Sequence, residues 1–172
     1  MGHDGGMEPV SAERYRETLA RYATGVVVLS AHDDEYGDVG STVTSFCSVS
    51  LEPPLVVASI GTLSRMFDTL DLQPLWGVSV LAADQRHVAG RFATPGRPGA
   101  GVLLTGVSSH RGEHSDALLL DDALASFECR TYTRADAGDH TLFVGEVLAV
   151  DHVRDGEPLL RFGHHYRSPT FP

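Results

Sequence analysis

The sequence predicts a mainly β domain in which short antiparallel strands form a barrel or a sandwich. Two observations support this fold class. The 172-residue chain holds six or seven short apolar segments of strand character but only two or three segments of helical character. The strand segments mostly follow one another directly, without the crossover helices that a parallel sheet requires. The chain length corresponds to one domain.

The first part of the chain combines a helix with a strand. Residues 1–8 are rich in glycine and polar side chains, which predicts a disordered tail, so the domain is expected to cover residues 9–172. Over residues 9–23 apolar side chains recur every three to five positions, a spacing typical of an amphipathic helix that Gly25 is suited to end. The β-branched run 26–29 predicts a strand.

The middle of the chain alternates turns, strands and short helices. The polar residues 32–38 are typical of a turn, and residues 39–49 are rich in Ser, Thr and Val. After Pro53 and Pro54, the apolar residues 55–60 predict another strand. The next expected elements are a short helix around 66–70, a strand over 75–81 and a helix over 84–92 with Asp84 as its N-cap.

Loops and two further strands are expected in the last part of the chain. Residues 95–101 and 108–116 have loop composition, and residues 124–132 and 141–150 predict strands with residues 138–140 in the turn between them. No repeat, heptad pattern or long linker divides the chain, which agrees with a single domain.

Composition excludes several classes of protein. The formal net charge is −10, and all 13 basic residues are scattered arginines, so binding to nucleic acid or to an anionic membrane is not expected. Backbone amides can still hold a small anionic ligand. Two cysteines exclude a disulfide-rich scaffold. The chain contains neither an apolar run of membrane-spanning length nor a secretory signal, so we expect a cytoplasmic protein.

Sequence motifs give no support for several common kinds of site. The glycine-rich dinucleotide, P-loop and hydrolase-elbow motifs are missing. Residues 110–114 match the pattern H-x-x-E-H, but an internal glycine and flanking serines indicate a chance match in a loop. His164 and His165 are adjacent and would point to opposite faces of a strand, so we expect no metal site. Cys47 and Cys129 are expected to be buried apolar groups.

The most informative segment covers residues 40–55, where hydroxyl side chains alternate with apolar ones. The hydroxyl residues are Ser41, Thr42, Thr44, Ser45, Ser48 and Ser50. Such a strand forms either a solvated sheet face or a shelf for a flat polar ligand that carries a phosphate, such as a flavin. Composition alone leaves both interpretations open.

This segment resembles the signature of the short flavin reductases, Gly-x-Thr-x-x-Ser-Phe-x-Ser-Val-Ser-Leu-x-Pro-Pro-Leu. Residues 138–147, Gly-Asp-His-Thr-Leu-Phe-Val-Gly-Glu-Val, resemble a second signature of that family. Further likenesses lie at residues 21–29, 78–85, 90–93, 124–130 and 166–167. The chain is therefore identified as a member of the flavin reductase family.

The resemblance implies an antiparallel six-stranded Greek-key split β-barrel with a few flanking helices that assembles as a homodimer. It implies one flavin per subunit, in a groove at or near the dimer interface. The implied activity is the reduction of FAD or FMN by NADH, in some members by NADPH. The implied partner is a separate flavin-dependent monooxygenase that receives the free reduced flavin.

The resemblance also assigns roles to residues by position. The isoalloxazine ring is expected to be bordered by Thr42, Thr44, Ser45, Phe46 and Cys47. The ribityl chain and phosphate are expected near Ser48, Ser50, Ser64 and Arg65, with Arg91 and Phe92 closing that side. The nicotinamide is expected to face Gly138, Asp139 and His140, with Tyr166 nearby.

His140 is the one catalytic candidate among these residues. It is expected to place the nicotinamide and to hydrogen-bond the reduced flavin; the alternative is that His140 only stabilises its turn. The sequence departs from the family at Cys47, where Thr is common, at Asp122, where Gly is frequent, and in the short loop 94–101.

Two other functions stay open at this point. One is a flavoprotein that keeps its flavin bound and acts as an oxidoreductase or electron carrier. The other is a non-catalytic flavin-binding protein. The sequence does not distinguish FAD from FMN or NADH from NADPH, and it does not identify the monooxygenase.

Overall fold

A computed structural model describes residues 8–35, 37–94 and 96–169, so the expected tail at residues 1–8 lies almost wholly outside the described residues. The helices are α1 (Ala12–Leu19), α2 (Arg65–Leu72), the 3-10 helix η1 (Ala83–Gln85), α3 (Arg86–Ala93) and α4 (Ala100–Leu103). The strands are β1 (Thr24–Gly25), β2 (Val27–Asp33), β3 (Gly37–Val43), β4 (Phe46–Leu51), β5 (Pro54–Gly61), β6 (Leu75–Val80), β7 (Ser109–Arg111), β8 (Leu118–Leu120), β9 (Ala125–Ala137), β10 (His140–His152), β11 (Leu160–Phe162) and β12 (His165–Arg167).

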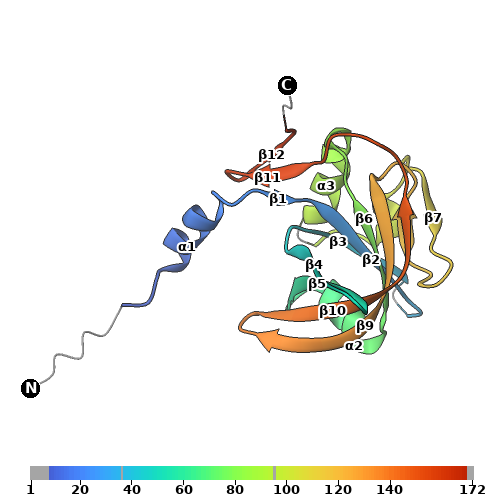
Figure 1. Ribbon diagram of the computed structural model, residues 1–172, viewed down its shortest axis with the longest axis horizontal. Helices are drawn as coiled ribbons and strands as arrows, with labels where there is room; N and C mark the ends of the chain where they lie inside the picture. Colours follow the sequence, from blue (N-terminus) through green and yellow to red (C-terminus); the bar gives the residue numbers. More distant parts are fainter. Residues whose placement is uncertain (1–7, 36, 95, 170–172) are drawn as a thin grey trace, which may run out of the picture.

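A strongly curved antiparallel sheet is the centre of the molecule (Figure 1). Its strand order is β3-β2-β6-β9-β10-β5-β4, and every neighbouring pair is antiparallel. Strands β1, β11 and β12 form a small second sheet, and β7 and β8 form a third, two-stranded sheet. The mainly β, antiparallel fold class is thereby confirmed, with a main sheet of seven hydrogen-bonded strands.

Two apolar clusters hold these elements together. The first lies inside the curved sheet and includes the fully buried Trp76 and Phe143, with α2 contributing Met66 and Leu70. The second lies outside it, where α3 and α4 cover β2 and β3. The core is closely packed at Gly145: a Cβ atom there would lie 2.3 Å from the Trp76 ring, too close for any residue larger than glycine unless the ring moved.

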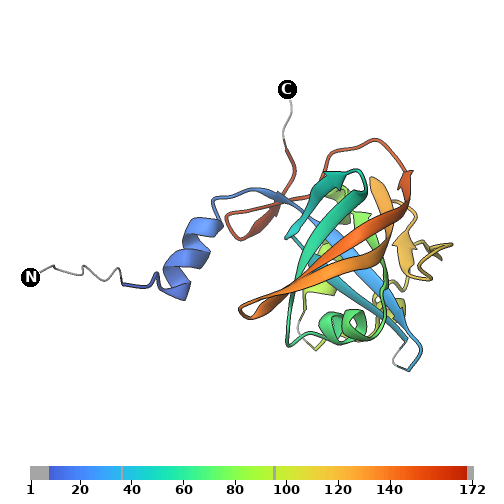
Figure 2. The ribbon, with the colours of Figure 1, turned by 60° about the horizontal axis from the view of Figure 1, so that its bottom comes forward.

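Helix α1 stands away from the rest of the molecule (Figure 2). Ser11 is its N-cap, and the Ser11 hydroxyl accepts a hydrogen bond from the Arg14 amide at 3.3 Å. None of its residues is buried. The helix is shorter than the predicted range 9–23.

The prediction of Asp84 as a helix N-cap was wrong. A 3-10 turn occupies residues 83–85, and α3 begins only at Arg86. Gln85 occupies the N-cap position of α3 but makes no side-chain cap there; its side-chain oxygen accepts from the Ala82 amide at 3.0 Å, at the start of the 3-10 helix.

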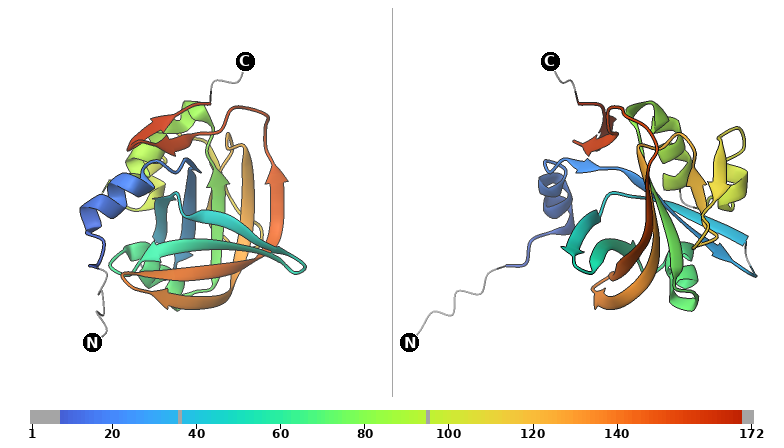
Figure 3. Two further views of the ribbon diagram at one scale, coloured as in Figure 1. Left: turned by 60° about the vertical axis from the view of Figure 1, so that its left-hand side comes forward. Right: turned by 45° about the vertical axis from the view of Figure 1, so that its right-hand side comes forward.

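Further local predictions concern the lengths of two strands and the burial of the two cysteines. Strands β9 and β10 are 13 residues each, longer than predicted; the last residues of β9, 132–137, are exposed and lie along β10, which pairs with β5 on its other side (Figure 3). Cys47 is exposed on β4 rather than buried. Cys129 is buried as predicted, and burial raises the pKa of its thiol to about 12.

Glu128 anchors the loop between β7 and β8 from inside. Its carboxylate is 7% exposed and accepts three hydrogen bonds, from the His114 amide at 2.8 Å and from the Ser115 amide and hydroxyl at 2.7 Å. Burial raises the pKa of Glu128, but these hydrogen bonds outweigh it and hold the pKa below its usual value. A Cβ at Gly112 would fall 2.3 Å from the carboxylate, so the loop closes tightly around it.

The substitution Glu128→Gln is expected to lower the free energy of unfolding by about 1.5–3 kcal/mol at neutral pH, because a neutral amide oxygen accepts the three hydrogen bonds that converge on Oε2 more weakly than a carboxylate does. Since the folded pKa is depressed, the stabilisation is present above the ordinary carboxyl pKa of about 4.3 and is lost as the pH falls through the folded pKa. Urea unfolding at several pH values checks this. An unchanged difference between wild type and variant at low pH would contradict it.

No helix in the described part of the chain is both long and apolar enough to cross a membrane. The same residues contain no group of three or more His, Cys, Asp or Glu side chains arranged to hold a metal ion. Residues 110–114 span the end of β7 and the turn after it, not a helix, as the chance interpretation of the H-x-x-E-H match requires.

Candidate functional site

A two-residue corner lies where the chain passes from one edge of the main sheet to the other. Thr44 and Ser45 separate β3 from β4, which are the two outermost strands in the sheet order. The Ser45 hydroxyl donates to the Ser59 carbonyl at 2.9 Å and accepts from the Ser59 amide at 3.3 Å. The corner is therefore fastened to β5.

The Gly-Asp-His turn lies over the end of β5. Gly138 has a φ of +69°, which glycine adopts without strain and which closes the tight β9–β10 hairpin. The amide and hydroxyl of Thr62 donate to the Asp139 carbonyl at 3.0 and 3.2 Å. The His140 ring faces Gly61, where a Cβ would lie 3.7 Å from Nε2. The turn and the β5–α2 connection therefore form one unit.

Asp139 orients the imidazole of His140. The Nδ1 atom of His140 lies 2.7 Å from the Asp139 carboxylate, and both side chains are exposed. This hydrogen bond, together with the charge of His140, lowers the pKa of Asp139. With the Nδ1 position occupied by the carboxylate, Nε2 is the ring atom presented toward Gly61.

A cationic cavity of about 410 Å³ opens beside the start of α2. Its lining comes from β3, from the connection before α2 and from the loop after α3, and includes Gly40, Ser64, Arg65 and Arg97. Ser64 is the N-cap of α2; its hydroxyl accepts from the Phe67 amide at 3.2 Å and donates to the Gly61 carbonyl at 2.8 Å. Two guanidinium groups beside a helix N-terminus favour an anionic ligand.

Gly40 and Phe92 form one wall of this region. Phe92 is 1% exposed and belongs to the second apolar cluster, so its ring supports the wall and is not itself an open surface. A Cβ at Gly40 would fall 2.3 Å from the Phe92 ring. The glycine of the first motif is thus required by helix–sheet packing.

A second groove, of about 440 Å³, lies on the other side of the corner. It runs between α1, the corner residues Thr44 and Ser45, and the turn between β11 and β12. Its cationic residues include Arg16 and Arg161, and the Arg161 guanidinium lies over the Tyr166 ring at 5.0 Å. The positive charge of Arg16 also contributes, as the smallest cause, to the lowered pKa of Asp139.

Several predicted site residues have hydroxyl or guanidinium groups that bond within the protein. The Thr42 hydroxyl donates to the Ala89 carbonyl at 2.7 Å. The Arg91 guanidinium donates to the Leu103 and Thr105 carbonyls at 2.9 and 3.2 Å. Neither side chain lines the cationic cavity or the groove beside α1. Their proposed contact with flavin thus requires these bonds to change.

The remaining residues of the first motif follow β4 away from the cavity. Phe46 packs on Phe127 with ring centroids 5.7 Å apart, against the inner core. Cys47 and Ser48 are exposed along β4, and the Ser50 hydroxyl accepts from the Glu52 amide at 3.2 Å in the turn before β5. Ser50 pairs with Leu55, at the opposite end of β5 from Gly61. The fold of this chain therefore does not bring Ser48 and Ser50 together with Ser64 and Arg65.

Arg97, Gly61 and Thr62 are residues of this region that the sequence patterns did not indicate. Arg97 lies in a Gly- and Pro-rich loop, where no periodicity tells which side chain turns inward. Thr62 contacts the Gly-Asp-His turn across 77 residues of sequence, a long-range contact that no local pattern contains.

Comparison with known proteins places these features in a family. The profile of the flavin reductase like domain matches residues 19–170. The chain belongs to the flavin reductase family. The matched range includes the corner, the residues of the cationic cavity and the Gly-Asp-His turn, but it leaves out α1 before Leu19.

Individual relatives cover most of the chain. It is 40% identical over 149 residues to the FMN reductase (NADH) SmoA of Agrobacterium fabrum, covering 87% of this chain and 81% of that protein. It is 35% identical to the reductase component of the 4-hydroxyphenylacetate 3-monooxygenase of Thermus thermophilus, over 93% of this chain and 98% of that one. The solved structure of the NADH:FAD oxidoreductase SgcE6 of Streptomyces globisporus superposes with a TM-score of 0.84 at 34% identity, covering 94% and 95% of the two chains.

Proposed function

We propose that this protein is an NADH-dependent flavin reductase that releases reduced flavin to a partner monooxygenase. The observation that carries the proposal is the position of the β5–α2 connection. Its first residue, Thr62, contacts the Gly-Asp-His turn, whereas its last residue, Ser64, and the first residue of α2, Arg65, line the cationic cavity. A ligand with a phosphate at one end and a ring at the other fits this arrangement.

The residues present suit a flavin and a nicotinamide nucleotide. When both are bound, NADH supplies a hydride and the flavin accepts it, which is chemistry of the cofactors themselves. The chain contributes positioning: Arg65 and the α2 N-terminus attract the phosphate, and the corner residues Thr44 and Ser45 lie along the ring side. Asp139 fixes the orientation of His140, which places the nicotinamide.

The function also requires that flavin leaves after reduction. His140 and Arg65 are both exposed side chains, and both cavities open to solvent, which suits a substrate that exchanges rather than a buried prosthetic group. A catalytic amount of protein should therefore reduce a large excess of FMN or FAD anaerobically with NADH, and the reduced flavin should pass a filter that retains the protein. Reduction that stops at one flavin per chain would instead support the flavoprotein that keeps its flavin.

The flavin and the partner are inferred from relatives that differ from one another. One is named for FMN, another for FAD, and a third is the reductase component of a monooxygenase. We therefore propose a monooxygenase partner without choosing its substrate, and NADH as the donor. The cytoplasm, where NADH is abundant, is the compartment that we propose.

We also propose that the main sheet closes as a six-stranded Greek-key split barrel. Strands β3 and β4 are separated only by Thr44 and Ser45, yet they lie at opposite ends of the strand order. Counted as one bent strand, they leave six strands, and the corner joins the two edges of the sheet. The Ser45–Ser59 hydrogen bonds support this closure.

We further propose that the protein forms a homodimer. The side chains of Tyr15, Leu19 and Tyr22 are 59%, 49% and 70% exposed, on a helix and the turn after it that project from the chain. Apolar side chains in such a position are typical of a surface that a partner covers. A second copy of this chain is the proposed partner, because the α1 groove then becomes part of an intersubunit site.

The dimer predicts a change of mass on mutation. The triple variant Tyr15→Ser, Leu19→Ser and Tyr22→Ser is expected to elute as a monomer, whereas the wild type elutes with twice the chain mass. Leu72→Ser is the control, since Leu72 is 76% exposed at the other end of α2 from the cavity and should leave the dimer intact. Light scattering after size exclusion measures both masses. A monomeric wild type would contradict the proposed dimer. It would not contradict the reductase activity, which the flavin reduction assay tests independently.

A further inference from the structure

We propose that Thr62 is a positioning residue for hydride transfer from NADH. Its hydroxyl holds the Gly-Asp-His turn against the β5–α2 connection, and this contact sets the affinity for NADH while leaving the affinity for flavin unchanged. The inference rests on the proposed function, because it assigns to Thr62 a part in that reaction. Thr62 lies outside both family motifs, and only the fold brings it to the turn, across 77 residues of sequence.

Thr62 contacts the turn through its backbone and through its side chain. The last residue pair between β5 and β10 joins Gly61 and His140, and Thr62 is the next residue of the chain. The Thr62 amide donates to the Asp139 carbonyl at 3.0 Å, and the Thr62 hydroxyl donates to the same oxygen at 3.2 Å. Any residue except proline supplies the amide, whereas the second donor depends on the side chain at position 62.

The hydroxyl acts on an exposed part of the chain. The turn lies at the tip of the β9–β10 hairpin, and the side chains of Asp139 and His140 are 94% and 48% exposed. The Thr141 hydroxyl donates to the Asp136 carboxylate at 3.0 Å, which joins the two strands of the hairpin to each other but not to β5. Exposed tips of this kind move more than the strands they connect. The two bonds from Thr62 tie the tip to the β5–α2 connection.

The Asp139 carbonyl transmits this restraint to His140. The carbonyl of Asp139 and the amide of His140 belong to one planar peptide group, so a donor that fixes the direction of the carbonyl also fixes the plane in which His140 begins. Two donors on one oxygen restrict that direction more than one donor does. The Asp139 carboxylate, 2.7 Å from Nδ1, then orients the ring. Thr62 thus positions the backbone of His140, and Asp139 positions its imidazole.

The donor itself is held in place by the start of α2. The Ser64 amide and hydroxyl donate to the Gly61 carbonyl at 3.1 and 2.8 Å, which closes the connection on both sides of Thr62. Ile60 before it and Met66 after it are 4% and 0% exposed in the inner core. The connection is therefore the fixed element, and the turn is the element that it positions.

Thr62 acts on NADH and not on flavin because it lies outside the region proposed for flavin. Its neighbours Leu63, Ser64 and Arg65 line the cationic cavity, whereas Thr62 lines neither that cavity nor the groove beside α1. Its hydroxyl donates to the turn instead. Loss of the hydroxyl should therefore change the kinetics of NADH and leave the binding of flavin as it is.

The test replaces the hydroxyl by a methyl group. Thr62→Val keeps the amide and the branched shape, and it is expected to raise KM for NADH about 3- to 10-fold at saturating FMN, the effect of one neutral hydrogen bond. Its kcat, its Kd for FMN by fluorescence titration and its unfolding temperature should stay close to those of wild type. Thr62→Ser keeps the hydroxyl and should hold KM for NADH within about twofold of wild type.

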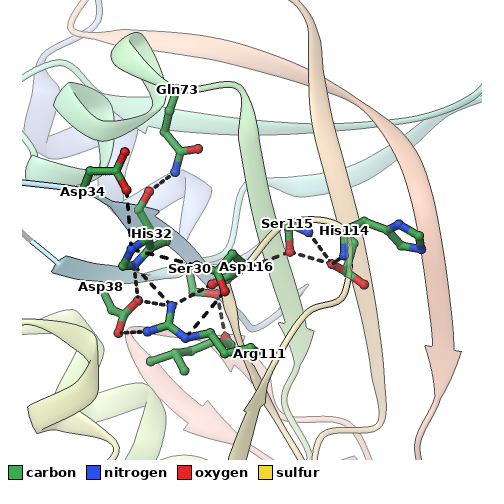
Figure 4. Close-up of polar contacts among 12 residues, drawn as sticks. Ser30, His32, Asp34, Asp38, Gln73, Arg111, His114, Ser115 and Asp116 are labelled. Atoms are coloured by element: carbon green, nitrogen blue, oxygen red, sulfur yellow. Dashed lines mark hydrogen bonds and ion pairs between the residues drawn. The ribbon is translucent and has the colours of Figure 1, made fainter.

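Ser30 provides a matched control, because its hydroxyl also donates to a carbonyl that is distant in sequence. The acceptor is the Leu118 carbonyl, 2.6 Å away, where β2 meets β8 (Figure 4). Ser30 is 2% exposed and lines neither the cavity nor the groove, so Ser30→Ala should lower the unfolding temperature and leave KM for NADH unchanged. The two variants thus separate loss of stability from loss of positioning.

The inference would be overturned, while the reductase stands, by an unchanged KM for NADH in Thr62→Val or by an equal rise in Thr62→Val and Thr62→Ser. A rise in KM that is matched by an equal weakening of FMN binding would also overturn it, because the hydroxyl would then act on both ligands. A wild type that oxidises no NADH with either FMN or FAD would overturn both the inference and the proposed function.

Discussion

Replacing His140 with alanine is expected to lower kcat/KM for NADH about 100-fold, the size of effect that a misplaced reacting group produces. The reason is the geometry of the Gly-Asp-His turn. Thr62 fixes the turn through the Asp139 carbonyl, and the Asp139 carboxylate fixes the ring, so His140 presents Nε2 beside Gly61. Steady-state rates at saturating flavin measure the effect.

The control for His140 is its neighbour. Asp139→Asn keeps a side chain of the same shape but removes the charge that orients the imidazole, so it should give a smaller loss of the same kind. Because both side chains are exposed, both variants should unfold at the wild-type temperature. An unchanged KM for NADH together with an unchanged kcat in His140→Ala would show that the histidine only stabilises its turn.

Reversing the charge at Arg65 is expected to weaken FMN binding by more than about 100-fold, since Arg65→Glu replaces a charged hydrogen bond by repulsion. The helix itself should tolerate the change, because Arg65 is the first residue of α2, where an acidic side chain interacts favourably with the helix dipole. The loss of affinity can therefore be separated from loss of fold. Fluorescence titration and thermal unfolding measure the two quantities.

A substitution that keeps the positive charge at position 65 serves as the control. Arg65→Lys should keep most of the affinity, since the phosphate still meets a positive charge. If Arg65→Glu bound FMN as tightly as wild type, the cationic cavity would not be the phosphate site. The flavin would then have to lie elsewhere, and the groove beside α1 would be the next region to test.

The strands of the main sheet could be predicted because their apolar or β-branched runs face a core on at least one side. The runs at 26–29, 55–60 and 75–81 all became central or near-central strands. The outer half of β9 could not be predicted, since residues 132–137 are all exposed and carry no periodic pattern. Short strands such as β11 and β12 depend on pairing partners far away in sequence.

The structure places the predicted site residues differently, for physical reasons that differ between residues. Ser64 and Arg65, assigned by position from the family resemblance, line the cationic cavity, and the turn at 138–140 contacts Thr62 shortly before them in the chain. Thr42 and Arg91 are close in the sequence to Gly40 and Ala93, which line the cavity. Their own polar groups, however, donate hydrogen bonds to carbonyls of α3 and of the α4 region. Which polar group a protein uses internally depends on tertiary packing, which a motif does not describe.

The most direct test is the initial rate of NADH oxidation by purified protein as FMN or FAD is added. The proposed function predicts almost no oxidation without flavin and a rate that rises and saturates with added flavin. Oxidation at the full rate with no flavin added would show a retained prosthetic group. No oxidation with either flavin would contradict the reductase and leave a flavin-binding protein of the same fold.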